Sequence, residues 1–268
     1  MQQVTIKRIK IYQVDAFTDR LFAGNPAAVC FLKEWLNDQT MQDIAFENNL
    51  AETAFVVPRG SLYEIRWFTP AVEVDLCGHA TLATAFVIYH CLGYKAPVIV
   101  FHSPRSGELK VRNEKNLLWL DFPADVLVHS GDSAIIRDCI GIEPIEVIRG
   151  KTDYIAMLGC ETDVLLLKPD MIKTAALNAR GLIVTAPGNE VDFVSRFFAP
   201  QSGIDEDPVT GSAHTSLIPL WSEKLGKREM EARQLSQRGG RLFCIDNGAR
   251  CLIGGEARLY FEGELILP

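Results

Sequence analysis

The sequence lacks the features that mark several specialised classes of protein. Among its 268 residues, no uncharged apolar run reaches the ~18 residues that a membrane-spanning helix needs. The stretch Met1–Lys10 is polar and basic and no apolar core follows it, so we expect no secretory signal. No run of Lys and Arg stands out and the net charge is −7, which argues against nucleic acid or an anionic membrane as a partner.

Cysteine is present but is not arranged as a scaffold. The chain has 7 cysteines, an odd number, and no pair is spaced as Cys-x-x-Cys. This pattern argues against a disulfide framework and against a zinc ribbon, and it is typical of a reducing compartment. We therefore expect a cytoplasmic protein without a structural metal.

Cofactor and nucleophile motifs are missing as well. No Gly-x-Gly-x-x-Gly follows a predicted strand and there is no His-Glu-x-x-His, so the sequence predicts neither a dinucleotide nor a catalytic metal. Gly150-Lys151-Thr152 resembles the end of a phosphate loop, but Ile145 stands where the first glycine is required. Ser212 lies in Thr-Gly-Ser-Ala and not in the Gly-x-Ser-x-Gly of a hydrolase.

The composition is that of a soluble globular protein, with 48% hydrophobic and 23% charged residues. A chain of this length suits two domains of about 130 residues each. The Pro- and Asp-rich segment 123–132 is the expected boundary, which gives domains at 1–122 and 123–268. We include in this expectation that the final strand can pack back on the first domain. The expected active site is the cleft between the two domains.

An internal duplication organises the chain. Phe68–Gly93 and Phe198–Gly226 each contain an aromatic-x-Pro followed by an apolar helical stretch that ends in Leu-Gly. Gly78 and Gly93 are 15 positions apart, and so are Gly211 and Gly226. A helix that is apolar nearly all round is normally enclosed on every side, so we expect an α+β fold in which a sheet curls around one helix in each half.

Periodicity and turn signals predict the other elements. Helices are expected at 38–48, 78–93, 134–140, 171–178 and 212–225. Strands are expected at 7–15, 27–32, 54–57, 63–68, 98–102, 108–112, 117–122, 154–157, 164–167, 181–185, 193–198, 231–236, 242–245, 249–253 and 258–265.

The starts of the two apolar helices are the candidate ligand sites. Each begins with a glycine and small residues, Gly78-His79-Ala80-Thr81 and Thr210-Gly211-Ser212-Ala213. Unpaired N–H groups and the helix dipole favour an anion at such an end, although the glycines can equally serve only a tight turn. The same dipole disfavours a cation, so we expect the His79 imidazole to be neutral.

Two carboxylates lie near these helices. Glu52 stands in a largely apolar link before a strand, where it is either solvated or poised as a base. Asp207 precedes the second helix and either caps it or contacts substrate. The second half offers Arg180 and no acid at the place that matches Glu52, so the two halves differ chemically.

The motifs together resemble one family. NNLAETAFV (48–56), FTPAVEVDLCGHATLATA (68–85), LDFPA (120–124), DPVTGSA (207–213) and VDAFTDRLFAGNPAAV (14–29) are similar to segments of the PhzF-like, phenazine-biosynthesis family. The resemblance covers nearly the whole chain. It implies two similar domains, each a barrel-like sheet around a central helix, as in diaminopimelate epimerase. It also implies a homodimer that needs neither metal nor organic cofactor.

The resemblance also implies the chemistry. Glu52 matches the acid/base glutamate of the family, His79 the histidine of Gly-His, and Asp207 the aspartate of Asp-Pro-x-Thr-Gly-Ser. Gly78, Gly211 and Ser212 match positions that hold the substrate in this family. The family reaction is the isomerisation of a dihydro-hydroxyanthranilate, in which a proton leaves one ring carbon and returns to another. We therefore expect a cofactor-independent isomerase that acts on a small, cyclic carboxylate by acid/base catalysis.

Two alternatives stay open at this point. Related epimerases and racemases of amino acids place one thiol from each half at the substrate carbon, whereas here Cys77 has no cysteine counterpart around Asp207–Gly211. We therefore expect Cys77 to be a packed small side chain. The other alternative is a protein that binds a small ligand and has lost turnover. The identity of the substrate does not follow from the sequence.

Overall fold

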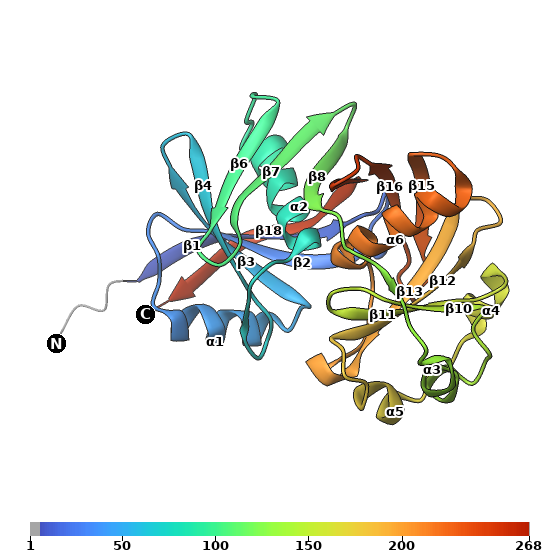
Figure 1. Ribbon diagram of the computed structural model, residues 1–268. Coiled ribbons are helices and arrows are strands. Elements are labelled where there is room, and N and C mark those ends of the chain that lie inside the picture. The colour runs from blue at the N-terminus through green and yellow to red at the C-terminus, as the bar shows by residue number, and fades with distance from the viewer. Residues whose placement is uncertain (1–5, 268) are drawn as a thin grey trace. The chain divides into compact units, whose positions relative to one another are not determined.

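The computed structural model describes residues 6–267, and the chain divides into two compact units. The first unit contains the chain up to Leu120 and again from Gly255, and the second is Asp121–Gly254. Both are mixed α+β, and in each a curved sheet surrounds one apolar helix, as in diaminopimelate epimerase-like proteins (Figure 1).

Among the described residues, the first unit contains two helices, a π-helical turn, eight strands from the amino-terminal half of the chain and the last strand, β18. Its strands are β1 (Lys7–Ala16), β2 (Asn25–Phe31), β3 (Glu52–Arg59), β4 (Leu62–Phe68), β5 (Glu73–Val74), β6 (Val98–Ser103), β7 (Gly107–Glu114), β8 (Leu117–Pro123), which leads into the second unit, and β18 (Ala257–Leu267). Its helices are α1 (Asp38–Asn48) and α2 (Gly78–Phe86), followed by the π-helical turn Val87–Cys91.

Helix α1 begins and ends where its residues predict. The side chain of Asn37 accepts a hydrogen bond from the Thr40 amide at 2.8 Å and so caps the helix. Asn49 ends it in the left-handed conformation with φ 48°, which asparagine tolerates better than most residues. This end delivers the chain to β3, which starts at Glu52.

Helix α2 is the centre of the first unit. All its residues from His79 to Ala85 are buried, including two threonines. Thr81 Oγ1 donates to the Cys77 carbonyl at 2.6 Å and Thr84 Oγ1 to the Ala80 carbonyl at 2.7 Å, so neither hydroxyl is left unpaired in the core. Gly93, with φ 72°, follows the π-helical turn.

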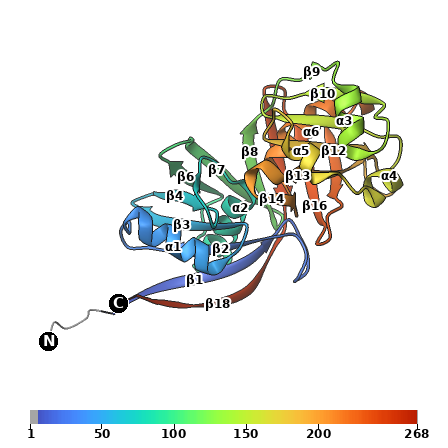
Figure 2. The ribbon, with the colours of Figure 1, turned by 90° about the horizontal axis from the view of Figure 1, so that it is seen from below.

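The edge of the first unit joins segments from opposite ends of the chain. Strand β18 pairs antiparallel with β1 from Lys7 opposite Leu267 to Ala16 opposite Ala257, with one irregularity between Gln13 and Val14. Figure 2 shows the two long strands running side by side. Strand β1 also pairs with β2 on its other side, so the sheet of this unit is complete only with residues 257–267.

The second unit repeats this plan. Its strands are β9 (Val128–His129), β10 (Glu146–Arg149), β11 (Asp153–Met157), β12 (Gly181–Pro187), β13 (Phe193–Ala199), β14 (Ile204–Asp207), β15 (Glu229–Gln234), β16 (Gly240–Asp246) and β17 (Arg250–Gly255). Its helices are α3 (Ser133–Ile140), α4 (Glu161–Leu166), α5 (Met171–Ala175), the 3-10 turn Pro200–Ser202 and α6 (Gly211–Leu225).

The strand pairings show that the two units are copies. In the first unit β2 and β3 pair in parallel, β3 and β4 antiparallel, and β4 and β6 in parallel. In the second unit β11 and β12, β12 and β13, and β13 and β15 pair in the same three senses. In sequence, α2 lies between β4 and β6, and α6 lies between β13 and β15, which are the two strands of the third pairing in each unit. Gly226 follows α6 with φ 65°.

One expected element is wrong. Residues 164–167 were expected to form a strand, but Glu161–Leu166 is the helix α4. Glu161 and Asp163 lie in its first turn, where the helix dipole favours acidic groups, and only Val164 of the apolar residues in this helix is buried. The helix therefore turns most of its apolar surface outward, which a pattern based on hydrophobicity alone misreads. Strand β10 was not expected from any pattern in the sequence.

In the part of the chain that the structure describes, no helix has both the length and the apolar composition to cross a membrane.

Candidate functional site

The main candidate site lies where β2, β3 and α2 begin. Strands β2 and β3 run parallel with Ala27 opposite Glu52, so Asn25 and Glu52 come to the same edge of the sheet. The first residues of α2, Gly78 and His79, lie against this edge because His79 contacts both side chains. The sequence predicted Glu52 and His79 as functional residues, and the structure brings these two together.

Glu52 and His79 form the central pair of this site. Glu52 Oε2 lies 3.1 Å from His79 Nε2, and the two side chains are 13% and 6% exposed. Beyond this contact, neither Glu52 Oε2 nor His79 Nε2 has a hydrogen-bond partner among the described residues. The contact is therefore a close, buried electrostatic pair, and the carboxylate keeps a lone pair for another proton.

The other nitrogen of the imidazole faces two further side chains. Asn25 Nδ2 lies 3.2 Å and Cys77 Sγ 3.5 Å from His79 Nδ1. If His79 is neutral, the Asn25 amide N–H donates to Nδ1 and the ring proton is on Nε2, the nitrogen that faces Glu52. An imidazolium carries a proton on both nitrogens, and the Asn25 amide oxygen then has to face Nδ1. Asn25 is wholly buried. Asn25 was not among the predicted site residues, because no local pattern in the sequence shows that it lies next to His79.

The charge of His79 differs from the expectation. Burial lowers the pKa of His79, but the neighbouring Cys77 and Glu52 raise it by more, so the pKa lies well above its ordinary value. This direction differs from the expected neutral imidazole, because Cys77 and then Glu52, whose carboxylate lies 3.1 Å away, favour the charged ring. Burial raises the pKa of the Cys77 thiol to about 11, so this group is a thiol at neutral pH.

A metal site fits this cluster poorly. The ligand atoms of Glu52, Cys77 and His79 lie within 4.8 Å of one another. Cys77 contacts Nδ1 of the ring, however, while Glu52 contacts Nε2. A bound ion needs all ligand atoms to point at one centre, and an imidazole can turn only one of its two nitrogens toward that centre.

In the second unit, Asp207 lies in a network just before α6. Its carboxylate accepts a hydrogen bond from the Thr210 hydroxyl. Gln234 accepts from the Thr210 amide at 2.8 Å and donates to the Asp207 carbonyl at 2.7 Å. Asp207 therefore holds the side chain of the residue that precedes α6, and the helix itself has no side-chain cap.

Ser212, the second residue of α6, is held from the side by a charged group. Arg180 Nη1 donates to Ser212 Oγ at 2.9 Å, and the same guanidinium donates twice to the carboxylate of Asp153. Asp153 is 1% exposed. The sequence identified Ser212 and Gly211 as candidates, but Arg180 and Asp153 are 27 residues apart and no motif connects them.

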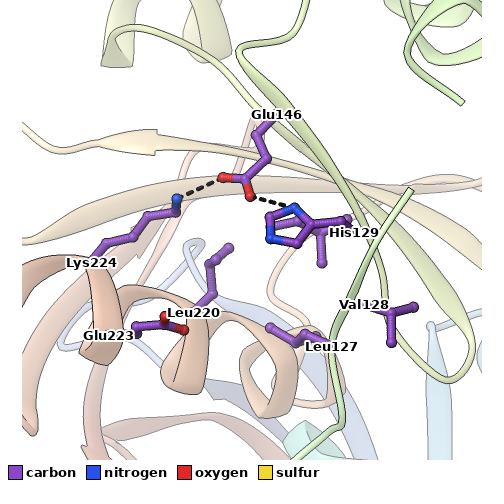
Figure 3. Close-up of a pocket in the computed structure, with 8 residues that line it drawn as sticks. Leu127, Val128, His129, Glu146, Leu220, Glu223 and Lys224 are labelled. Carbon is purple, nitrogen blue, oxygen red and sulfur yellow. Dashed lines mark hydrogen bonds and ion pairs between the residues drawn. The ribbon is translucent and has the colours of Figure 1, made fainter. Parts of the chain in front are cut away.

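A separate pocket of about 230 Å³ lies beside α6 in the second unit (Figure 3). Glu146 pairs there with His129 at 3.0 Å and with Lys224 at 2.6 Å, near the apolar side chains of Leu127 and Leu220. His129 is 85% exposed, so this ion pair is weak. None of the predicted site residues lines this pocket.

Comparison with known proteins connects these observations. Residues 14–263 match the PhzC-PhzF family, which is described as phenazine biosynthesis-like protein. An uncharacterized isomerase of Pseudomonas aeruginosa is 50% identical over 259 residues, which are 97% of this chain and 99% of that protein. A crystal structure of a PhzF-family phenazine biosynthesis protein of Enterococcus faecalis has a TM-score of 0.95 at 44% identity, covering 97% of this chain and 100% of that one.

A more distant structure shows only the fold. The structure of a predicted epimerase from Pseudomonas aeruginosa has a TM-score of 0.75 at 17% identity, covering 97% of this chain and 100% of that one.

Proposed function

Because the chain belongs to the PhzC-PhzF family, we propose that it is an isomerase that moves a proton within a small carboxylate substrate, with Glu52 as the acid/base group. The observation that carries this proposal is the buried Glu52–His79 pair at 3.1 Å. It holds a carboxylate in a mostly apolar environment at the start of α2, and His79 is the contact of Glu52 Oε2 among the described residues. The isomerase name of the relative from Pseudomonas aeruginosa supports the class of reaction.

The proposed mechanism uses one carboxylate for both proton transfers. Glu52 takes a proton from a carbon of the substrate, which leaves the electron pair of that C–H bond delocalised in the substrate. The resulting carboxylic acid returns the proton to a second carbon, and Glu52 is again a carboxylate. No group is oxidised or reduced, and no co-reactant is consumed.

His79 has an electrostatic role in this mechanism. Its raised pKa favours the imidazolium form, which stabilises negative charge on Glu52 before the reaction. It also stabilises negative charge that develops on a bound substrate. The amide of Gly78, in the first turn of α2, is proposed to contribute to the same stabilisation. Asn25 keeps the ring in place from the other side.

The role of the second unit is a separate proposal. We infer from the family motif that Asp207, Gly211 and Ser212 take part in substrate binding, and that Asp207 also assists catalysis. The network through Thr210 and Gln234 supports this role, since it fixes the backbone at the start of α6. Substitution of each residue tests it by itself, and we expect Ser212→Ala to raise KM more than it lowers kcat.

Deuterium exchange tests the proposed function and does not require an identified substrate. The protein is incubated in D₂O with a panel of small cyclic carboxylic acids, and NMR follows their C–H protons. We expect deuterium to enter one position of an accepted compound, and Glu52→Gln to slow this by ~100-fold or more. Glu47→Gln, at an exposed position of α1, is the matched control and is expected to leave the rate unchanged.

The same experiment separates the alternatives. An epimerase would scramble a stereocentre, and a binding protein would leave every C–H proton in place. An active Glu52→Gln protein together with an inactive Cys77→Ala protein would contradict the role given to Glu52. The homodimer that the family implies is tested by analytical ultracentrifugation, in which a monomer at all concentrations would contradict it.

A further inference from the structure

Arg180 lies one residue before Gly181, which is the position in the second unit that matches Glu52 in the first, because Thr53 pairs with Phe68 and Leu182 with Phe198. Glu52 begins β3, which pairs in parallel with β2, and Arg180 directly precedes β12, which pairs in parallel with β11. The contact is repeated as well. Glu52 lies 3.1 Å from His79, the second residue of α2, and Arg180 lies 2.9 Å from Ser212, the second residue of α6. The duplicated fold therefore presents an acidic side chain in one unit and a basic one in the other.

Asp153 fixes the guanidinium of Arg180 in one orientation. The Nε and Nη2 groups of Arg180 donate to the two oxygens of this carboxylate, which is the geometry that best orients an arginine. The side chain of Asp153 is 2% exposed, so the pair is anchored in the protein interior at its acidic end. The guanidinium also lies over the ring of Phe197, 5.2 Å from its centre. An arginine whose only role was to neutralise the charge of Asp153 would need no other hydrogen-bond partner.

The donors that remain point to a ligand. Arg180 uses three of its five N–H groups on Asp153 and Ser212, and its side chain is 38% exposed. Ser212 Oγ accepts from Arg180, so its own hydroxyl proton is directed elsewhere, and it has no acceptor among the residues that the structure describes. Two guanidinium N–H groups and one hydroxyl are thus available side by side. All are donors, and they lie at the start of the 15-residue helix α6, which has no side-chain cap.

We propose that Arg180 and Ser212, oriented by Asp153, bind a carboxylate group of a small organic acid. Planar, paired donors match the two oxygens of a carboxylate, and the positive end of α6 adds to the attraction. This inference deepens the proposed function, on which it rests for the nature of the ligand, because it assigns the substrate carboxylate to a residue pair. Asp153 is a positioning residue in this arrangement, since it acts through Arg180.

NMR on ¹⁵N-labelled protein tests the proposal with benzoate as the probe and benzamide, which has no charge, as its comparison. We expect benzoate to shift the Nε–H signal of Arg180 and the amide signal of Ser212 saturably, and benzamide to bind at least ~10-fold more weakly. Ser212→Ala keeps the Arg180–Asp153 pair and is expected to weaken benzoate binding several-fold. Arg180→Lys keeps the charge but not the fork of donors, and a ~10-fold loss is expected.

Arg233→Gln is the matched control, because Arg233 is a 42%-exposed arginine of the same unit that pairs with Glu190. It tests whether the loss of another arginine charge in this unit affects benzoate, and we expect unchanged binding. The proposal is overturned if benzoate causes no saturable shift at the highest soluble concentration. It is also overturned if benzamide binds equally well, or if Arg180→Lys and Ser212→Ala both bind benzoate like the wild type.

The fates of the two proposals can be told apart. Benzoate binding does not need Glu52, so Glu52→Gln is expected to abolish deuterium exchange and to keep the shifts at Arg180. Loss of exchange in Glu52→Gln with no benzoate effect at Arg180 would retain the isomerase and reject the carboxylate site. Benzoate binding that depends on Arg180, in a protein that exchanges no C–H proton, would retain the carboxylate site and reject the isomerase.

Discussion

Asn25 and His79 are 54 positions apart in the sequence, yet Asn25 Nδ2 lies 3.2 Å from His79 Nδ1 in the core of the first unit. The amide reaches the ring nitrogen opposite the one that faces Glu52. Asn25 can therefore influence the orientation and the protonation of His79 through the nitrogen that does not face the proposed base.

Asn25→Ala is expected to lower turnover by about tenfold, because one buried hydrogen bond to the imidazole is worth on the order of 1 kcal/mol. The change removes an orienting contact and leaves Glu52 in place. The ¹⁵N shifts of the His79 ring report its protonation state, and we expect them to change in the variant. Unchanged ring shifts and full activity would show that Asn25 does not act on His79. The exposed Asn189 provides the matched Asn→Ala control.

The His79–Glu52 pair predicts a pH dependence of stability at neutral and alkaline pH. The pKa of His79 is raised in the folded protein, so its contribution to the free energy of unfolding is fully present below the unfolded pKa of ~6.5. It is lost as the pH rises through the folded pKa. Urea unfolding of the wild type and of His79→Gln at several pH values from ~6.5 upward checks this.

The difference in stability between these two proteins is expected to shrink as the pH rises. His102→Gln, at an exposed site, is the control for the effect of a His-to-Gln substitution itself. A difference for His79→Gln that grew with pH would have the wrong sign and would reject the ion pair.

His214 predicts the opposite trend in acid. Burial lowers the pKa of His214 to about 4, and its Nδ1 lies 2.8 Å from the Thr210 carbonyl, which only partly offsets the effect. The neutral ring therefore contributes stability above ~6.5 that is lost as the pH falls toward 4. A shift of this size corresponds to ~3 kcal/mol at most.

Replacing His214 with Gln removes this titration. We expect the free energy of unfolding of His214→Gln to fall less steeply between pH ~6.5 and ~4 than that of the wild type. Equal slopes for both proteins would mean that the buried ring does not titrate in this range.

Gly181 allows the close approach of two strands directly after Arg180. A Cβ at this position would lie 2.4 Å from Phe197 Cζ and 2.9 Å from the Phe198 carbonyl oxygen. We expect Gly181→Ala to lower the free energy of unfolding by ~1–3 kcal/mol because of this overlap. Gly131 meets nothing within 4 Å, so Gly131→Ala is the matched control in the same unit. Equal stabilities of the two variants would contradict the expected overlap.

The sequence predicted what depends on local pattern. The positions of Gly78, Gly93, Gly211 and Gly226 defined the two central helices and their duplication, and the structure confirms both helices. The segment after Cys160 was misread, because the exposed Leu165 and Leu166 of α4 resemble the apolar run of a strand. Hydrophobicity does not show which side of such a run meets the core.

Contacts between distant residues could not be predicted in this way. Glu52 and His79 were singled out separately, and their contact joins the start of β3 to the start of α2, which no local pattern predicts. The charge of His79 followed the neighbour and not the helix, so an argument from the helix dipole alone had the wrong sign. Arg180 was noted as the counterpart of Glu52, but its bond to Ser212 spans 32 positions.

The pairing of β1 with β18 has a consequence for the order of folding. Because a ribosome releases the chain from its amino terminus, residues 121–254 emerge complete before strand 257–267 does. The second unit can therefore fold first. Until β18 has been synthesised, the edge of β1 that pairs with it has unpaired backbone N–H and C=O groups. Slow translation or a stall near residue 255 would leave that open edge exposed to other nascent chains, a condition that favours aggregation.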